Sequence, residues 1–243
     1  MRRRQAARGA ERDGRAALSG VYVYALLGEA PRPDAGAGLC AEPLRVVRVG
    51  DLVAAVGEMA ERPAVSEATL RAHDAVIRRL ADTVDAILPV RFGSLLSESA
   101  LTDALAARGR ELTEALALVA GREQMTLRLM GEAAPRPAPA AAPDHPELGP
   151  GARYLAARRA EWRRAHEAPE LEPLRPALQP LVRAERVTRH ETPPLLASVY
   201  HLIDRGASAV YRGAVERAGS AALVRIVATG PWPPYAFAPE ALG

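Results

Sequence analysis

The spacing of apolar residues in this chain alternates between the period of strands and the period of helices. VYVYALL at 21–27 is rich in β-branched and aromatic residues, which favours a strand. Two further apolar runs, LRVVRV (44–49) and LVAAVGEM (52–59), are separated only by Gly50 and Asp51. A Gly-containing two-residue turn between such runs predicts a hairpin. The first part of the chain must therefore begin as a small antiparallel sheet.

A helical period follows this predicted hairpin. Apolar residues and one histidine recur at intervals of three and four residues, which predicts a helix of about five turns that Pro89 brings to an end. We expect LPVRFG (88–93) to emerge from it as a short strand closed by Gly93, and Ser97 to cap a second helix that stops at Gly121. The residues of the first helical stripe are Leu70, His73, Ile77, Leu80, Val84 and Ile87.

The second half of the chain repeats this mixture of strands and helices. We therefore predict an α+β protein with two α+β domains and small, mainly antiparallel sheets. An extended C-terminal tail rich in proline and aromatic residues is expected to follow them. Strands are expected at 123–131, 186–191, 195–203 and 222–230, and helices at 152–167 and 205–219. A stretch rich in Pro and Ala separates the two halves and favours an extended connector or loop. The expected divisions are a disordered Arg-rich extension at 1–18, an N-terminal domain at 19–131, a linker or loop at 132–150, a C-terminal domain at 151–228 and the tail at 229–243.

The charge of the chain is concentrated at its N-terminus. The formal net charge is +3 and the pI about 9.4, which invites the hypothesis of a polyanionic partner. Residues 1–17, however, hold six of the 32 basic residues and only two acids, so the other 226 residues carry a net charge of −1. A solvated extension is therefore expected at the N-terminus in preference to a nucleic-acid-binding arm.

Composition also bears on compartment and membrane association. Cys40 is the only cysteine, so no intramolecular disulfide forms, and a reducing, cytoplasmic environment is expected. The first residues lack the apolar segment of a secretory signal, and no apolar run is long enough to span a bilayer. We therefore expect no membrane as a partner.

The sequence offers no convincing catalytic or metal-binding arrangement. It contains neither a G-x-S-x-G motif nor two histidines at the spacing of a zinc-protease helix, and it has no lysine for a Schiff base. His73 lies on the helical stripe, where a hydrogen-bonded core histidine is favoured over a pH switch. We expect a protein that is not an enzyme and has no catalytic residue, cofactor or metal.

Nucleic-acid binding is the alternative function. Residues 151–190 hold nine Arg against five Glu, and Tyr154 and Trp162 in the same region could stack on bases. Trp162 is, however, needed for the inward face of the predicted helix, and arginines there require only solvent. An Arg-rich nucleic-acid-binding α+β module therefore remains the second hypothesis, and no nucleic acid is expected as a partner.

The segment TGPWPPYAFAP at 229–239 is unusual in a chain whose aromatic content is only 4%. Its prolines restrict the backbone and exclude a regular helix or a central strand, while three aromatic residues lie within six positions. Two interpretations remain open. Either the tail folds back and buries its aromatic rings in the core, or it presents a preformed surface to a partner.

Four segments together resemble one known family. GPWPPYAF (230–237), LPVRFGSLL (88–96), VYVYALL (21–27) and GARYL (151–155) occur here in the arrangement of the gas vesicle protein family GvpL/GvpF, and the resemblance spans about residues 20–239. It implies a two-domain α+β protein with a ferredoxin-like element and no catalytic activity. It further implies a minor structural or accessory protein required for gas vesicle assembly, located in the cytoplasm and at gas vesicles.

The resemblance also implies partners, namely the hydrophobic main shell protein and other gas vesicle accessory proteins, bound during nucleation of the vesicle. An apolar shell protein aggregates unless it is covered before assembly, and aromatic or edge-strand surfaces could cover it. For each candidate residue a structural role, such as joining the two domains, is an equally open interpretation. The candidates for partner binding or for an interdomain motif are Arg91, Phe92, Gly93, Pro231, Trp232, Pro233, Pro234, Tyr235 and Phe237.

Overall fold

The computed structural model describes residues 20–32, 35–132, 167–219 and 222–239, together with the single positions Gly151 and Arg158. The Arg-rich extension expected at 1–18 lies outside the described residues. The same holds for the connector after Glu132 and, apart from Arg158 and Glu167, for the helix predicted at 152–167.

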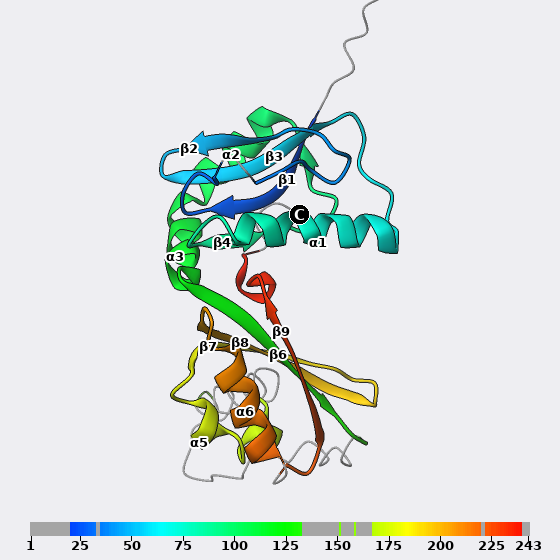
Figure 1. Ribbon diagram of the computed structural model, residues 1–243, viewed down its shortest axis with the longest axis vertical. Coiled ribbons are helices and arrows are strands. Elements are labelled where there is room, and N and C mark those ends of the chain that lie inside the picture. The colour runs from blue at the N-terminus through cyan, green and yellow to red at the C-terminus, as the bar shows by residue number, and fades with distance from the viewer. Residues whose placement is uncertain are drawn as a thin grey trace, which may run out of the picture.

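The N-terminal sheet is antiparallel and is built around its first strand (Figure 1). The strand order is β2-β3-β1-β4. Strand β4 pairs with the C-terminal part of β1, and β5 pairs with its N-terminal part. The predicted hairpin is confirmed, because β2 and β3 pair in register around the turn at Gly50. The strands are β1 (Gly20–Leu27), β2 (Leu44–Val49), β3 (Leu52–Met59), β4 (Ile87–Pro89) and β5 (Leu95–Leu96).

Helices cover both faces of this sheet. Helix α1 (Glu67–Ala81) packs on the face that carries Tyr22 and Tyr24, and its N-terminus is closed by a capping box at Ser66. Helices α2 (Glu98–Ala107) and α3 (Gly109–Val119) pack on the opposite face, against Val21 and Val23. Because side chains alternate along β1, this strand contributes residues to two separate hydrophobic cores, one on each face of the sheet.

Two helix predictions need correction. The first helix ends at Ala81, so Val84 lies in the following loop and Ile87 in β4, although both are buried as the stripe predicted. The second predicted helix is two helices, because the backbone leaves helical geometry at Arg108 (φ −118°, ψ 16°), directly before Gly109. Glycine is a poor residue for a helix interior, which is consistent with a break at this point.

The second sheet has the strand order β7-β8-β6-β9, and all its pairings are antiparallel. Helical segments lie between β6 and β7 and between β8 and β9, and they pack on one face of the sheet (Figure 1). This succession and strand order are those of the ferredoxin-like fold. The elements are β6 (Arg122–Met130), η1 (Pro169–Leu171), α5 (Arg175–Leu178), β7 (Val182–Arg189), β8 (Leu195–Asp204), α6 (Ser208–Gly219) and β9 (Arg225–Trp232).

The sheet pairing does not follow the domain division expected at residues 131 and 132. The N-terminal domain expected at 19–131 includes strand β6, but this strand lies between β8 and β9 in the second sheet. The chain passes from α3 into β6 through Gly121, whose φ of +66° favours glycine. Residues 229–232 likewise belong to β9, so only the chain beyond Trp232 is an irregular tail. Because β9 is an edge strand, Pro231 disturbs no central ladder.

Candidate functional site

The C-terminal tail lies at the junction of the two sheets. After β9 it forms the short 3-10 helix η2 (Tyr235–Phe237), which sits beside β4 and α1 (Figure 1). Phe237 is only 1% exposed and shares a hydrophobic cluster with Leu88 and Val90 of the N-terminal domain and with Leu202 of β8. The aromatic ring at the end of the tail is thus part of a core to which both domains contribute. We call residues 230–239 the tail segment.

Polar contacts hold the tail segment against the second sheet. The backbone N–H of Ala236 donates to Oε1 of Gln124 at 2.8 Å, and Gln124 is buried on β6. Arg186 of β7 donates from Nη1 to the carbonyl oxygen of Ala236 at 2.6 Å. Its guanidinium carbon also lies 5.3 Å from the ring centroid of Phe237. Both backbone groups of Ala236 are therefore satisfied by side chains of the sheet.

A second set of contacts attaches the tail segment to α1. The hydroxyl of Tyr235 donates to Oδ1 of Asp74 at 2.8 Å, and Arg78 donates from Nε to Oδ2 of the same carboxylate at 2.6 Å. The guanidinium of Arg78 lies over the indole ring of Trp232, 4.6 Å from its centroid. One turn of α1 thus binds two aromatic residues of the tail. Trp232 is half-buried and Tyr235 is 37% exposed, so both remain partly accessible.

Arg205 forms a further link between the domains. It follows β8 and donates from its guanidinium to the carbonyl oxygens of Val84 at 3.1 Å and Asp85 at 3.2 Å, in the loop between α1 and β4. Its backbone N–H donates to the carbonyl oxygen of Gly121 at 2.9 Å. These contacts fix the connection between the domains on the side where the chain enters β6.

The LPVRFG motif is anchored by a chain of buried hydrogen bonds. The N–H of Gly93 donates to the hydroxyl of Tyr22 at 3.0 Å, and that hydroxyl lies 3.1 Å from Nδ1 of His73. Nε2 of His73 lies 3.3 Å from the carbonyl oxygen of Val90, which can only accept. We therefore assign the proton to Nε2, and Tyr22 donates to Nδ1. His73 is the hydrogen-bonded core histidine that the sequence favoured.

The three candidate residues of this motif have different surroundings. Phe92 packs edge-on against His73, with ring centroids 5.5 Å apart, and lies near Tyr22 at 6.3 Å. Gly93 has a φ of +88°, a conformation that favours glycine, and Arg91 is exposed. His73 and Asp74 are consecutive residues of α1, so this helix holds the LPVRFG loop with one and the tail segment with the other.

Burial lowers the pKa of His73, which makes stability depend on pH. In the unfolded chain its pKa is about 6.5. Between that value and the lower folded pKa only the unfolded state binds a proton, so the contribution of neutral His73 is complete above pH 6.5 and is lost as the pH falls. We expect the melting temperature of the wild type to fall more steeply between pH 7 and pH 5 than that of His73→Gln. Equal slopes in the two proteins would contradict this prediction.

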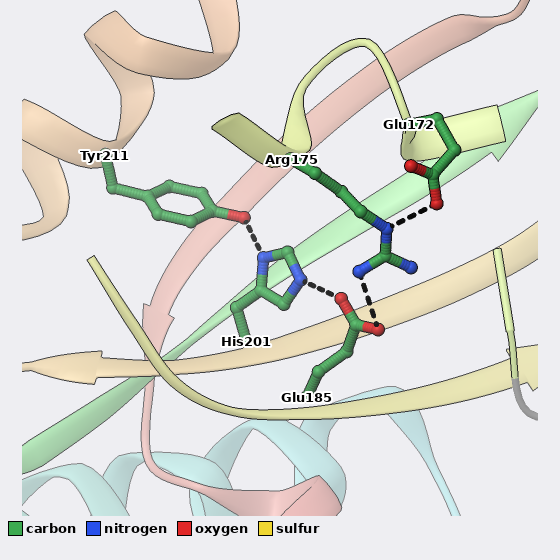
Figure 2. A network of polar contacts seen from close by, with 5 residues as sticks. All are labelled: Glu172, Arg175, Glu185, His201 and Tyr211. Atoms are coloured by element: carbon green, nitrogen blue, oxygen red, sulfur yellow. Dashed lines mark hydrogen bonds and ion pairs between the residues drawn. The ribbon is translucent and has the colours of Figure 1, made fainter. Parts of the chain in front are cut away.

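A second polar network lies inside the C-terminal domain (Figure 2). The hydroxyl oxygen of Tyr211 on α6 lies 2.6 Å from Nδ1 of His201, and Nε2 of His201 lies 2.8 Å from Oε2 of Glu185 on β7. Glu185 also pairs with Arg175 at 3.6 Å, and Arg175 donates to Glu172 at 2.8 Å. The His201 hydrogen bond lowers the pKa of the Glu185 carboxyl, and burial raises that of Tyr211.

This network resembles a catalytic triad in its connectivity but not in its exposure. Tyr211 is fully buried and His201 is 2% exposed, so the phenolic oxygen has no contact with solvent through which a substrate could approach it. The contacts join α6, β8, β7 and α5, which satisfies the buried imidazole and fixes the helices on the sheet.

Within the described part of the chain, no cluster of three or more His, Cys, Asp or Glu side chains is arranged to hold a metal ion. No helix formed by those residues combines the length and apolar character needed to cross a bilayer.

Several residues at the junction of the two sheets could not be recognised as functional candidates from the sequence. Asp74 is an acidic residue on an amphipathic helix, where a solvated position is the ordinary expectation, yet it binds Tyr235. Gln124, Arg186 and Arg205 carried no motif at all. The spacing of Asp74 and Arg78 at i and i+4 predicts an ion pair on α1, but their contacts with the tail segment depend on tertiary structure.

Comparison with known proteins is consistent with this architecture. Gas vesicle protein L2 from Halobacterium salinarum is 28% identical over 269 residues, covering 95% of this chain and 96% of that protein. Gas vesicle protein L from a Streptomyces species is 30% identical over 254 residues, covering 89% and 92% respectively.

Solved structures and a family model agree. The crystal structure of the gas vesicle protein GvpF from an Anabaena species is similar with a TM-score of 0.67 at 18% identity, covering 91% of this chain and 96% of that chain. The crystal structure of GvpF from Microcystis aeruginosa is similar with a TM-score of 0.66 at 17% identity, covering 90% of this chain and 99% of that chain. The model of the family described as gas vesicle synthesis protein GvpL/GvpF matches residues 20–239. This chain therefore belongs to the GvpL/GvpF family of gas vesicle proteins.

Proposed function

We propose that this chain is a non-enzymatic assembly protein that binds the hydrophobic main shell protein, and other gas vesicle proteins, while a vesicle is being nucleated. Membership of the GvpL/GvpF family supports a role in gas vesicle formation, and this family is one of structural or accessory proteins. Localisation at the gas vesicle follows from the same proposal.

The observation that carries the proposal is the partly exposed aromatic pair of the tail segment. Trp232 and Tyr235 are attached to α1 through Arg78 and Asp74, and both keep part of their surface accessible. Rigid aromatic side chains lose little conformational entropy on binding, so such residues are common anchors of protein interfaces. Phe237 is buried and therefore contributes to the proposal only by holding the segment in place.

The double substitution Trp232→Ala and Tyr235→Ala tests this proposal. We expect the variant to fold, to retain less main shell protein in co-purification by about tenfold, and to support fewer intact vesicles in cells that lack the wild-type gene. Trp232→Phe with Tyr235→Phe is the matched control, because it keeps an aromatic ring at each position and should retain most binding. Normal shell-protein binding and vesicle formation by a folded alanine variant would overturn the proposal.

A further inference from the structure

The face of the second sheet that is turned away from α5 and α6 is only partly covered. Met125, Leu127 and Leu129 of β6 point into the core beneath the helices, so the alternate positions Thr126 and Arg128 lie on the opposite face. At one end of that face the tail segment contacts Gln124, and Tyr200 packs against the cluster that contains Phe237. Farther along β6 Thr126 is buried, but the side chains of Arg128 and of Arg225 on β9 are exposed. Figure 1 shows α5 and α6 on the other side of the sheet.

These two exposed arginines lie next to each other. Arg128 is opposite Val227 in the β6–β9 pairing, and Arg225 is opposite Met130, which makes the two arginines diagonal neighbours on one face. Such neighbours are about 7–8 Å apart between their Cα atoms. Among the residues that the structure describes, no side chain forms a hydrogen bond or ion pair with either guanidinium, although the arginines of β7 are all engaged.

The residues opposite these cations in the neighbouring strands are uncharged. Ser198 of β8 is opposite Arg128, and its Oγ lies 2.9 Å from Nε2 of His190. Of the described strand positions on this face, only Asp204 is acidic. It pairs with Arg183 at 2.5 Å and lies opposite Arg122, at the other end of β6. Among the described strand positions, this end of the face therefore carries two exposed cations and no acidic side chain.

We infer that the surface formed by Arg128 and Arg225 binds a carboxylate-rich segment of a partner gas vesicle protein. Guanidinium groups bind carboxylates through charge-assisted hydrogen bonds, and two exposed cations that no described side chain pairs with are complementary to an acidic segment. A single-stranded nucleic acid is commonly bound through base stacking on aromatic rings, but Tyr200, the aromatic residue of β8 on this face, packs against the cluster that contains Phe237. This inference rests on the proposed function and adds a second contact surface to the tail segment.

Charge reversal tests the inference with the full chain. Arg128→Glu with Arg225→Glu is compared with the control Arg48→Glu with Arg110→Glu, which changes the net charge equally at two exposed arginines of the N-terminal domain. Each protein is co-expressed with the tagged main shell protein and, separately, with each other tagged gas vesicle protein, and co-purification is quantified at low and high salt. A polyuridine mobility-shift titration is run on the same proteins.

We expect the wild type and the control to retain at least one of these vesicle proteins in a salt-sensitive manner, and the Arg128/Arg225 variant to lose about tenfold or more of that retention while its melting curve is unchanged. Reversing acidic residues of the retained partner to arginine should restore binding to the variant. Equal retention by variant and wild type would overturn the inference but leave the proposed function standing. Failure of the wild type to retain any vesicle protein would instead contradict the proposed function, and polyuridine binding lost only in the variant would replace the acidic protein segment by a nucleic acid.

Discussion

Replacing Phe237 by alanine is expected to lower the free energy of unfolding by about 3–5 kcal/mol, the range for truncation of a fully buried phenylalanine. The ring is 1% exposed and packs in a cluster formed by β1, β3, the helices α2 and α3, the β4 region and Leu202 of the second sheet. Its removal would leave a cavity between the domains and would also remove the ring over which Arg186 lies. Urea denaturation followed by circular dichroism measures the loss.

Tyr235→Phe is the control for this prediction. It removes only the hydrogen bond to Asp74 from a residue that is 37% exposed, so the expected loss is about 1 kcal/mol or less. A Phe237→Ala variant as stable as Tyr235→Phe would show that the tail segment is not part of the common core. A loss in which the two domains unfold separately would show, in addition, that Phe237 couples them.

Gly230→Ala is expected to be the second strongly destabilising substitution. Gly230 has a φ of +121°, and an alanine held there costs about 1–3 kcal/mol in backbone strain alone. A Cβ at this position would also lie 2.8 Å from the carbonyl oxygen of Gln124 and 3.0 Å from the sulfur of Met125. Both atoms belong to the neighbouring strand β6, so relief requires β9 to move away from it.

Gly109→Ala provides the matched glycine control. Gly109 begins α3 and has open space around the position of a Cβ, so alanine there should leave stability unchanged or raise it by up to about 1 kcal/mol. Thermal melts of the two variants and the wild type are sufficient for the comparison. If Gly230→Ala melted at the wild-type temperature, the close approach of β9 to β6 at this position would be wrong.

The elements were largely predictable because their signals are local. The hairpin at Gly50 and the strands β1, β6 and β8 follow from residues that are adjacent in the chain. The predicted boundaries of elements were wrong where the same spacing of apolar residues fits both a helix and another buried element. Val84 and Ile87 continue the spacing of α1 but belong to a loop and a strand, since a buried residue can satisfy either element.

The candidate site was predictable as a set of unusual residues but not as an arrangement. The prolines and aromatic rings of the tail marked the segment, and the LPVRFG motif marked the loop after β4. Their connection through His73 and Asp74 could not be predicted, because those contacts join positions up to 161 residues apart. Likewise, Arg186 and Gln124 become tail-binding residues only when β7 and β6 are brought beside it.

By itself the sequence determined the class of fold, the identity of most strands and the family, because hydrophobic period, turn residues and short motifs are properties of neighbouring residues. Only the tertiary structure decided that β6 belongs to the second sheet and that the tail joins both domains. Strand pairing is chosen by backbone hydrogen bonding and by burial of a whole face, and these depend on segments far apart in the chain. The same pairing places Arg128 beside Arg225, which no reading of either segment alone could show.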